Sequence, residues 1–219
     1  MSIAENILSV QRRIEAAARR AGRLPESVTL VAVTKSATPR GVQAAYDAGL
    51  RHFGENRVQD AERKMEALAA LRDSVTWHMV GHLQTNKVSV AARLFAIIHS
   101  IDSVRLGEAL NRRLQSKLPV LLEVNVAGEA TKHGFRPNDV EVASKAISRC
   151  AQLEIRGLMT MAPQTRDPER ARPVFRRLRE LAEQLRLPEL SMGMTDDFEV
   201  AVEEGATMVR IGRAIFAES

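Results

Sequence analysis

The chain has 219 residues, 45% of them apolar and 27% charged, and a formal net charge of +5. This composition excludes a disordered protein, and the length suits one α/β-barrel domain. A single cysteine, Cys150, excludes an internal disulfide and a cysteine metal cluster and favours a reducing compartment.

The first predicted element is an amino-terminal amphipathic helix. Ser2 and Glu5 form a capping-box pattern, and an apolar stripe at helical spacing runs from Ile7 to Gly22. The next stretch, VTLVAVTKS over residues 28–36, is a short apolar run that ends in Lys35. Such a run predicts a strand buried on both faces, as in a parallel sheet.

After this strand the sequence alternates between helical and extended patterns. The further predicted strands are 52–54, 76–80, 95–99, 119–126, 153–159, 190–192 and 207–211. The predicted helices between them are 39–48, 58–71, 87–93, 104–118, 139–150, 168–187 and 196–204.

Eight strands that alternate with helices in a chain of this size predict a (β/α)₈ TIM-type barrel, as a single domain over residues 1–219. The sequence stops soon after the eighth strand, so we expect the amino-terminal helix to cover the gap there. An open doubly wound sheet is the alternative, but no early strand is followed by the G-x-G-x-x-G pattern.

In a barrel the functional residues gather where strands end at the carboxyl face. The residues at these ends are Lys35, Glu55 and Asn56, Gly81 and His82, His99 and Ser100, Asn125, Met159 and Met161, 191–195 and 210–213. Lys35 has two interpretations. It either reaches solvent or pairs with a carboxylate, as most lysines do, or it is a desolvated amine suited to forming a Schiff base.

The last two strand ends suggest a phosphate site. SMGMT (191–195) and IGR (211–213) offer glycines, hydroxyls and backbone N–H groups beside helix starts. Each is weak alone, since both could be ordinary glycine turns. Asp196 and Asp197 are expected to cap the following helix, with their carboxylates turned away from any anion.

Other polar residues are predicted to have structural roles. His78 and His99 lie in apolar strands, where we expect hydrogen-bonded core or rim residues, and no ligand spacing of a metal site is present. The methionines at 159, 161, 192 and 194 should pack the barrel floor or line its mouth. Tyr46, the single tyrosine, is expected in the first outer helix, away from the carboxyl face.

Partners and location follow from charge and composition. No apolar run approaches the ~18 residues of a membrane helix, and the amino terminus lacks a signal-peptide pattern. The arginines are spread over helical faces, and only 4% of residues are aromatic, which leaves few stacking platforms for nucleic acid. We therefore expect a cytoplasmic protein that binds neither membrane nor nucleic acid, with a positive field that suits a small phosphorylated ligand. We also expect a monomer.

A series of motifs resembles the pyridoxal phosphate homeostasis protein family, in order and across nearly the whole chain. The motifs are VAVTKS, FGENRVQ, WHMVGHLQTNK, HSID, NVAGEATKHG, IRGLMTM, SMGMTDD and MVRIGRAIF. Members of that family look like the barrel domain of fold-type III pyridoxal phosphate proteins, such as alanine racemase, without the second β domain.

The resemblance implies pyridoxal 5'-phosphate as cofactor and Lys35 as the Schiff-base lysine. It implies that Arg210 lies beside the pyridine nitrogen and that Asn56 is a further cofactor-binding residue. The residues it implies around the phosphate are Ser191, Gly193, Met194, Thr195, Gly212 and Arg213. Many relatives end in a run like IGTAIFG, whereas this chain has Arg213 for the threonine and Ala217 for the glycine. A guanidinium at 213 would replace the hydroxyl contact.

These residues favour a carrier of the cofactor over a catalyst, with apo pyridoxal phosphate enzymes as possible recipients. An arginine at the ring nitrogen disfavours its protonation and weakens the cofactor as an electron sink. Racemisation also needs a second acid or base, and Tyr46 is misplaced for it. A single-domain racemase is the alternative, and an aldolase-like barrel that uses Lys35 is a third class. Lys132, in the polar loop after the fifth strand, either has no role or helps to release the cofactor.

Overall fold

The computed structural model describes residues 2–217, and these contain eight parallel strands that pair in chain order and close into a barrel. The strands are β1 (Thr29–Val33), β2 (His52–Glu55), β3 (Thr76–Met79), β4 (Ile97–Ile101), β5 (Leu118–Glu123), β6 (Leu153–Met159), β7 (Glu189–Ser191) and β8 (Met208–Ile211). Because β1 pairs with both β2 and β8, the predicted (β/α)₈ barrel is confirmed and the open-sheet alternative is excluded.

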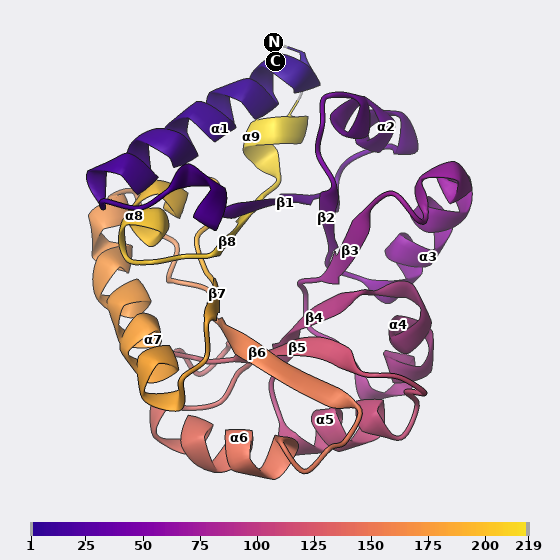
Figure 1. Ribbon diagram of the computed structural model, residues 1–219, viewed down its shortest axis with the longest axis vertical. Coiled ribbons are helices and arrows are strands. Elements are labelled where there is room, and N and C mark those ends of the chain that lie inside the picture. Colours follow the sequence, from indigo (N-terminus) through magenta and orange to yellow (C-terminus); the bar gives the residue numbers. More distant parts are fainter. Residues whose placement is uncertain (1, 218–219) are drawn as a thin grey trace.

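Helices form a ring around this barrel (Figure 1). The α-helices are α1 (Ile3–Arg20), α2 (Pro39–Asp47), α3 (Val58–Ala67), α4 (Val88–Leu94), α5 (Val104–Asn111), α6 (Val140–Ile147), α7 (Arg172–Leu185), α8 (Phe198–Glu203) and α9 (Arg213–Phe216). Short 3₁₀ turns are η1 (Pro25–Ser27), η2 (Ala69–Leu71), η3 (Thr85–Lys87), η4 (Pro137–Asp139) and η5 (Pro168–Ala171). None of the helices within residues 2–217 is long and apolar enough to cross a membrane.

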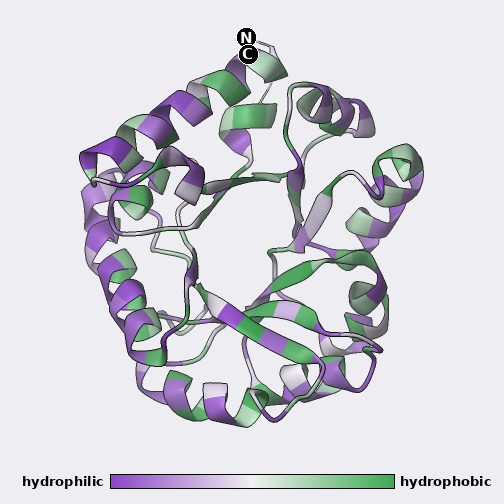
Figure 2. Ribbon diagram, viewed as in Figure 1, coloured by the Kyte–Doolittle hydropathy of each residue, from purple (hydrophilic) through white to green (hydrophobic). Residues whose placement is uncertain are grey.

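The core has two layers, because side chains alternate between the two faces of each strand. Along β1, Val31 and Val33 belong to the cluster inside the barrel, whereas Leu30 and Ala32 pack outward with the helices. The helices carry hydrophobic residues interleaved with hydrophilic ones, as expected for elements with one buried stripe (Figure 2).

The amino-terminal helix α1 completes the ring of helices between α8 and α2. The capping box of Ser2 and Glu5 is present, and α1 packs against α8 and the four-residue α9. Figure 1 shows α1 beside α9. The buried Asn6 side chain fixes this packing, because its Nδ2 donates to the Ile215 carbonyl oxygen at 3.1 Å.

Several predicted boundaries are wrong. Strand β4 runs from Ile97 to Ile101 and not over 95–99, because Phe95 closes the last turn of α4. The helix predicted over 104–118 ends at Asn111, and the stretch that follows is largely polar. The short α9 is not predicted by the sequence pattern.

Candidate functional site

Lys35 lies in a turn two residues beyond the carboxyl end of β1. The inward side chains of β1 are Val31 and Val33, so the alternation of the strand brings Lys35 to the mouth of the barrel. The Lys35 side chain is exposed in the structure. The amine is therefore not desolvated, which was one of the two interpretations of the sequence.

A buried polar cluster that sequence reasoning missed anchors this turn. Lys64 of α3 donates hydrogen bonds to the Thr34 carbonyl oxygen and to the carboxylate of Glu55, which the Thr34 hydroxyl also contacts. The Glu55 side chain is 1% exposed and that of Lys64 10%. The cluster therefore ties the segment before Lys35 to α3 and to the end of β2.

Arg210 occupies the barrel interior near the same end. It lies on β8 with the alternation of the inward Met208 and is only 4% exposed. Its guanidinium donates to the Ser191 hydroxyl at 2.5 Å and to the Thr160 carbonyl oxygen at 2.9 Å. Burial lowers the pKa of Arg210 to about 10, while Asp197 and Glu123 act to raise it, so the residue remains a cation at neutral pH.

A row of three histidines crosses the barrel interior and ends at Arg210. His52 Nδ1 lies 3.0 Å from His78 Nε2, and His78 Nδ1 lies 2.9 Å from His99 Nε2. His99 Nδ1 then contacts the Ser191 hydroxyl at 2.8 Å. The strand register explains the row, since His52 pairs with the residue two before His78, and His78 with the residue two before His99.

A guanidinium can only donate hydrogen bonds, so the Ser191 hydroxyl accepts from Arg210. Among the described residues its own proton has no acceptor other than His99 Nδ1. His99 Nε2 then donates to His78 Nδ1, and His78 Nε2 donates to His52 Nδ1. Burial lowers the pKa of His78 to about 3, and it lowers the pKa of His99 well below the usual range. His78 and His99 are therefore neutral, with their electron-rich Nδ1 atoms directed toward the buried cation. The expectation of hydrogen-bonded core histidines at 78 and 99 is confirmed.

The loop after β7 requires glycine at position 193. Gly193 has a φ of +90°, and a Cβ there would lie 2.5 Å from the Ala201 side chain. Asp197 is the N-cap residue of α8, but its side chain makes no capping hydrogen bond to the helix. Its carboxylate instead accepts from the Met194 backbone N–H at 2.6 Å, which occupies that donor. The Ser191 hydroxyl is likewise used inside the barrel. Among the residues described, the N–H of Thr195 has no acceptor.

The segment after β8 packs against the end of the neighbouring strand, β1. Gly212 approaches β1 so closely that a Cβ there would lie 3.0 Å from the Val33 carbonyl oxygen. Within residues 2–217, the backbone N–H groups of Arg213 and Ala214 have no acceptor, as is usual for a first helical turn. The Arg213 guanidinium contacts both carboxylate oxygens of Asp196, which also corrects the predicted capping role of that aspartate.

Asn56 follows β2 and is half-buried. Gly81, after β3, lies directly against it, because a Cβ on Gly81 would be 2.4 Å from the Asn56 carbonyl oxygen. Met159 packs inside the barrel with Met161 at its edge, as predicted, whereas Met192 packs in the outer layer.

Glu123 is a buried carboxyl group that the sequence analysis did not single out. It ends β5 with the inward alternation of Leu121, is 3% exposed, and its Oε2 has no hydrogen-bond partner among the described residues. Burial raises the pKa of Glu123 to about 7; Asp102 adds to this increase and Arg210 opposes it. Glu123 could therefore hold a proton at the barrel mouth near neutral pH.

Glu123→Gln is expected to change how stability depends on pH. The pKa of Glu123 is higher in the folded protein than its ordinary value of 4.5. Ionisation therefore favours unfolding, and the free energy of unfolding decreases as pH rises through this window. Between pH ~5 and ~8 the free energy of unfolding of the wild-type protein should decrease by about 2–3 kcal/mol more than that of Glu123→Gln.

Urea denaturation with a chelator present measures this difference. Glu154→Gln, at an exposed site, is the control, and an identical pH dependence in wild type and Glu123→Gln would contradict the expectation.

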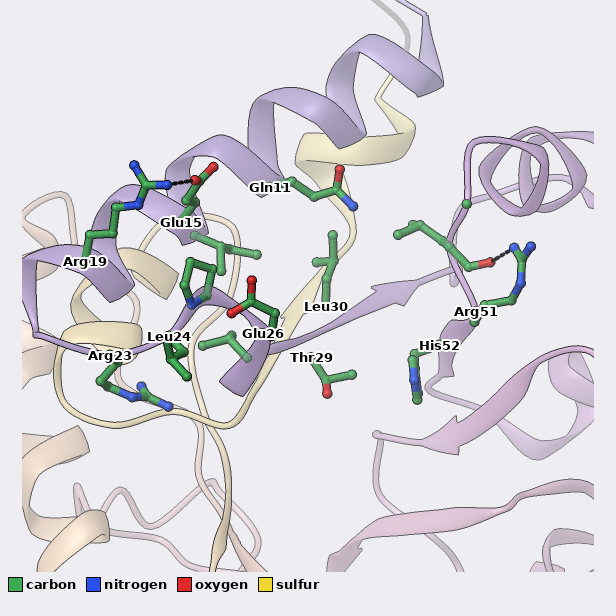
Figure 3. A pocket seen from close by; sticks show the side chains of 15 residues that line it. Gln11, Glu15, Arg19, Arg23, Leu24, Glu26, Thr29, Leu30, Arg51 and His52 are labelled. Atoms are coloured by element: carbon green, nitrogen blue, oxygen red, sulfur yellow. Dashed lines mark hydrogen bonds and ion pairs between the residues drawn. The ribbon is translucent and has the colours of Figure 1, made fainter.

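A separate pocket of about 760 Å³ opens at the opposite end of the barrel (Figure 3). It lies between α1 and the amino-terminal ends of β1 and β2, with Arg19, Arg23, Leu24 and His52 among its lining residues. Active sites of this fold are built at the carboxyl face. Its position thus separates this pocket from the residues around Lys35 and Arg210.

Comparison with known proteins gives matches over the full length of the chain. The family model described as "Alanine racemase, N-terminal domain" matches residues 6–219. The pyridoxal phosphate homeostasis protein of Aquifex aeolicus is 41% identical, covering 100% of this chain and 99% of its own length. That of Pseudomonas aeruginosa is 43% identical, covering 98% and 95%.

Solved structures agree with these matches. PipY of Synechococcus elongatus, solved without PLP and with PLP bound, is 38% identical and covers 99% of this chain and 100% of its own, with TM-scores of 0.88 and 0.86. Alanine racemase of Clostridium difficile is 11% identical with a TM-score of 0.74, a likeness of fold alone that involves 57% of that chain. The chain therefore belongs to the pyridoxal phosphate homeostasis protein family, whose barrel is that of the alanine racemase amino-terminal domain.

Proposed function

We propose that this protein binds pyridoxal 5'-phosphate as a Schiff base on Lys35 and carries it in pyridoxal phosphate homeostasis, without catalysis. The observation that carries the proposal is that Lys35 lies at the mouth of the barrel, at the same carboxyl end as the buried cation Arg210. Relatives named for this role and the PLP-bound structure of PipY support it.

The residues at the carboxyl face fit such a cofactor. The free N–H groups of Thr195, Arg213 and Ala214 lie on the segments after β7 and β8, and backbone N–H groups are good phosphate donors. Gly193 and Gly212 set the course of these two segments by packing closely against α8 and β1. Asn56 would contact the ring side. We do not assign the Ser191 hydroxyl, the Met194 N–H or the Arg213 side chain to the phosphate, because each already has a partner.

The chain's own groups determine what the bound cofactor could do. Pyridoxal phosphate supplies an electron sink whose strength depends on protonation of its ring nitrogen. Arg210 would direct a guanidinium donor at that nitrogen and disfavour its protonation. The Ser191 hydroxyl and the histidine row hold Arg210 in place and stabilise its charge. Tyr46 lies at the end of α2, stacked against Arg51, far from the mouth. This arrangement suits retention of the cofactor more than proton abstraction.

The protein is therefore expected to turn over no amino acid at an enzymatic rate. Exchange of the α-hydrogen of alanine with solvent deuterium is the sensitive assay, because it detects proton abstraction even without net conversion. Exchange at about 1 s⁻¹ or faster would contradict the carrier proposal and favour a racemase.

One observation favours that second candidate, a single-domain pyridoxal phosphate enzyme. Glu123 is a buried carboxyl group close enough to Arg210 for their charges to interact, with a pKa near neutrality. A group of this kind is suited to act as a general acid or base. If exchange is found, loss of exchange in Glu123→Gln would identify it as the group responsible.

Lys132 is positioned to influence release. It lies in the loop after β5, half-buried, and its amine pairs with Glu129 and lies 3.3 Å from the Ala162 carbonyl oxygen. A second amine at the mouth could receive the aldehyde from Lys35 and pass it outward, since Schiff bases exchange between amines.

Lys132→Ala is therefore expected to keep the bound cofactor but slow its transfer to an apo-enzyme. Transfer is followed by recovery of the recipient's activity. Lys145→Ala, which removes an exposed lysine of α6, is the matched control. Equal transfer rates for all three proteins would show that the loop has no part in release.

We place this carrier in the cytoplasm as a monomer, with apo pyridoxal phosphate enzymes as recipients and no nucleic-acid or membrane partner. The buried, free Cys150 is consistent with a reducing compartment.

A further inference from the structure

Three side chains that are distant in sequence converge at the carboxyl face, apart from the residues assigned to the cofactor. His82 follows β3, Asp102 follows β4 directly, and His133 lies in the loop after β5. One potential ligand atom from each lies within 4.8 Å of the others. The Asp102 Oδ2 is 3.0 Å from His82 Nδ1 and 3.7 Å from His133 Nδ1.

The geometry leaves this cluster incompletely satisfied. The two imidazole rings are stacked, with centroids 3.8 Å apart and planes 12° from parallel, and the Nδ1 atom of each is near the same carboxylate. Because an imidazole binds a metal in the plane of its ring, the more exposed His133 ring must turn for both nitrogens to reach one ion. Only the His82 contact is short enough for a hydrogen bond, and within residues 2–217 His133 Nδ1 has no other partner.

The local charge also favours a cation. Asp102 is only 12% exposed and lies near enough to Glu123 for the two carboxylates to repel. Lys132, the adjacent amine on the loop, is already paired with Glu129. A divalent ion would bring the two imidazoles and the carboxylate together as ligands and offset the negative charge.

We propose that His82, Asp102 and His133 bind one divalent transition-metal ion of the Zn²⁺ type. Two imidazole nitrogens and one carboxylate oxygen are the donors that Zn²⁺ and Co²⁺ accept, and three protein ligands leave at least one position open for water or a small ligand. No sequence spacing reveals this site, because its ligands lie on three separate strand-to-helix connections.

Metal binding would have a structural consequence for the loop after β5. His133 lies next to Lys132 in this loop, whereas His82 lies three residues after β3 and Asp102 directly follows β4. An ion that joins the three would fasten the loop to the barrel. The proposal concerns this chain's own side chains and stands independently of whether pyridoxal phosphate is bound.

The test uses the full chain without a polyhistidine tag, first treated with a chelator and then dialysed. Titration with Zn²⁺ in a calorimeter should show one site per chain, and Co²⁺ should give the visible absorption of a low-symmetry nitrogen–oxygen site. His133→Ala and Asp102→Asn should each weaken Zn²⁺ binding by more than about tenfold and abolish the Co²⁺ spectrum. Circular dichroism verifies that these variants fold.

Cys150→Ser removes the single thiol, the other side chain with high affinity for Zn²⁺, and should bind as wild type does. Amide hydrogen exchange in residues 127–134 should slow when Zn²⁺ is added to the wild type but not to His133→Ala. Absence of a one-to-one site, or binding that His133→Ala leaves unchanged, would overturn the proposal.

Discussion

Lys35→Ala is expected to abolish the visible absorption band of protein-bound pyridoxal phosphate. The band arises from conjugation of the cofactor with the lysine amine, so it requires the covalent link even where phosphate contacts remain. The variant should fold normally, because the Lys35 side chain is exposed and contributes no core packing. The measurement is an absorption spectrum after incubation with pyridoxal phosphate and gel filtration.

Two matched variants make this result specific. Lys145→Ala removes an exposed lysine of α6, and Lys132→Ala removes the lysine in the loop after β5; both variants should retain the band. A band of wild-type intensity in Lys35→Ala would show that another amine holds the cofactor.

Lys64→Met is expected to destabilise the protein by about 3–5 kcal/mol, the usual cost of breaking one side of a buried ion pair. The substitution leaves the Glu55 carboxylate buried and without its cation, and its Oε2 already has no hydrogen-bond partner within residues 2–217. It also removes a donor from the Thr34 carbonyl oxygen, which should loosen the turn that carries Lys35. Urea denaturation gives the change in the free energy of unfolding.

A double-mutant cycle separates the ion pair from simple loss of packing. Glu55→Gln together with Lys64→Met removes both charges, so the double variant should lose less stability than Lys64→Met alone. If the losses of stability in the single variants Glu55→Gln and Lys64→Met add up to the loss in the double variant, Glu55 and Lys64 are not coupled. The proposed anchoring role of the pair would then be wrong.

The barrel itself was predictable because its strands are short apolar runs at regular spacing. Burial on both faces requires such runs, as 28–36 illustrates, and the capping box at Ser2 marks the start of α1. The boundaries were less predictable where tertiary contacts decide them. Phe95 reads as a strand residue from its apolar character, yet it closes the last turn of α4, so β4 begins two residues later.

The site was predictable only where a residue's position along its own strand determines its place. Arg210 and Lys35 follow the inward alternation of β8 and β1, so their location at the carboxyl end could be inferred. The Glu55–Lys64 pair and the Ser191–Arg210 contact depend on pairing between elements, which a single sequence does not display. The histidine row had a usable signal, since three consecutive strands carry a histidine at an inward position.

Chemical trapping tests the central claim most directly. Borohydride reduces a Schiff base to a stable secondary amine. The cofactor therefore remains attached during proteolysis to the lysine with which it had formed the Schiff base. Peptide mapping by mass spectrometry after reduction of the purified protein should place the pyridoxyl label on Lys35. Label found only on other lysines, such as Lys117 or Lys145, would contradict the proposal that Lys35 carries pyridoxal phosphate.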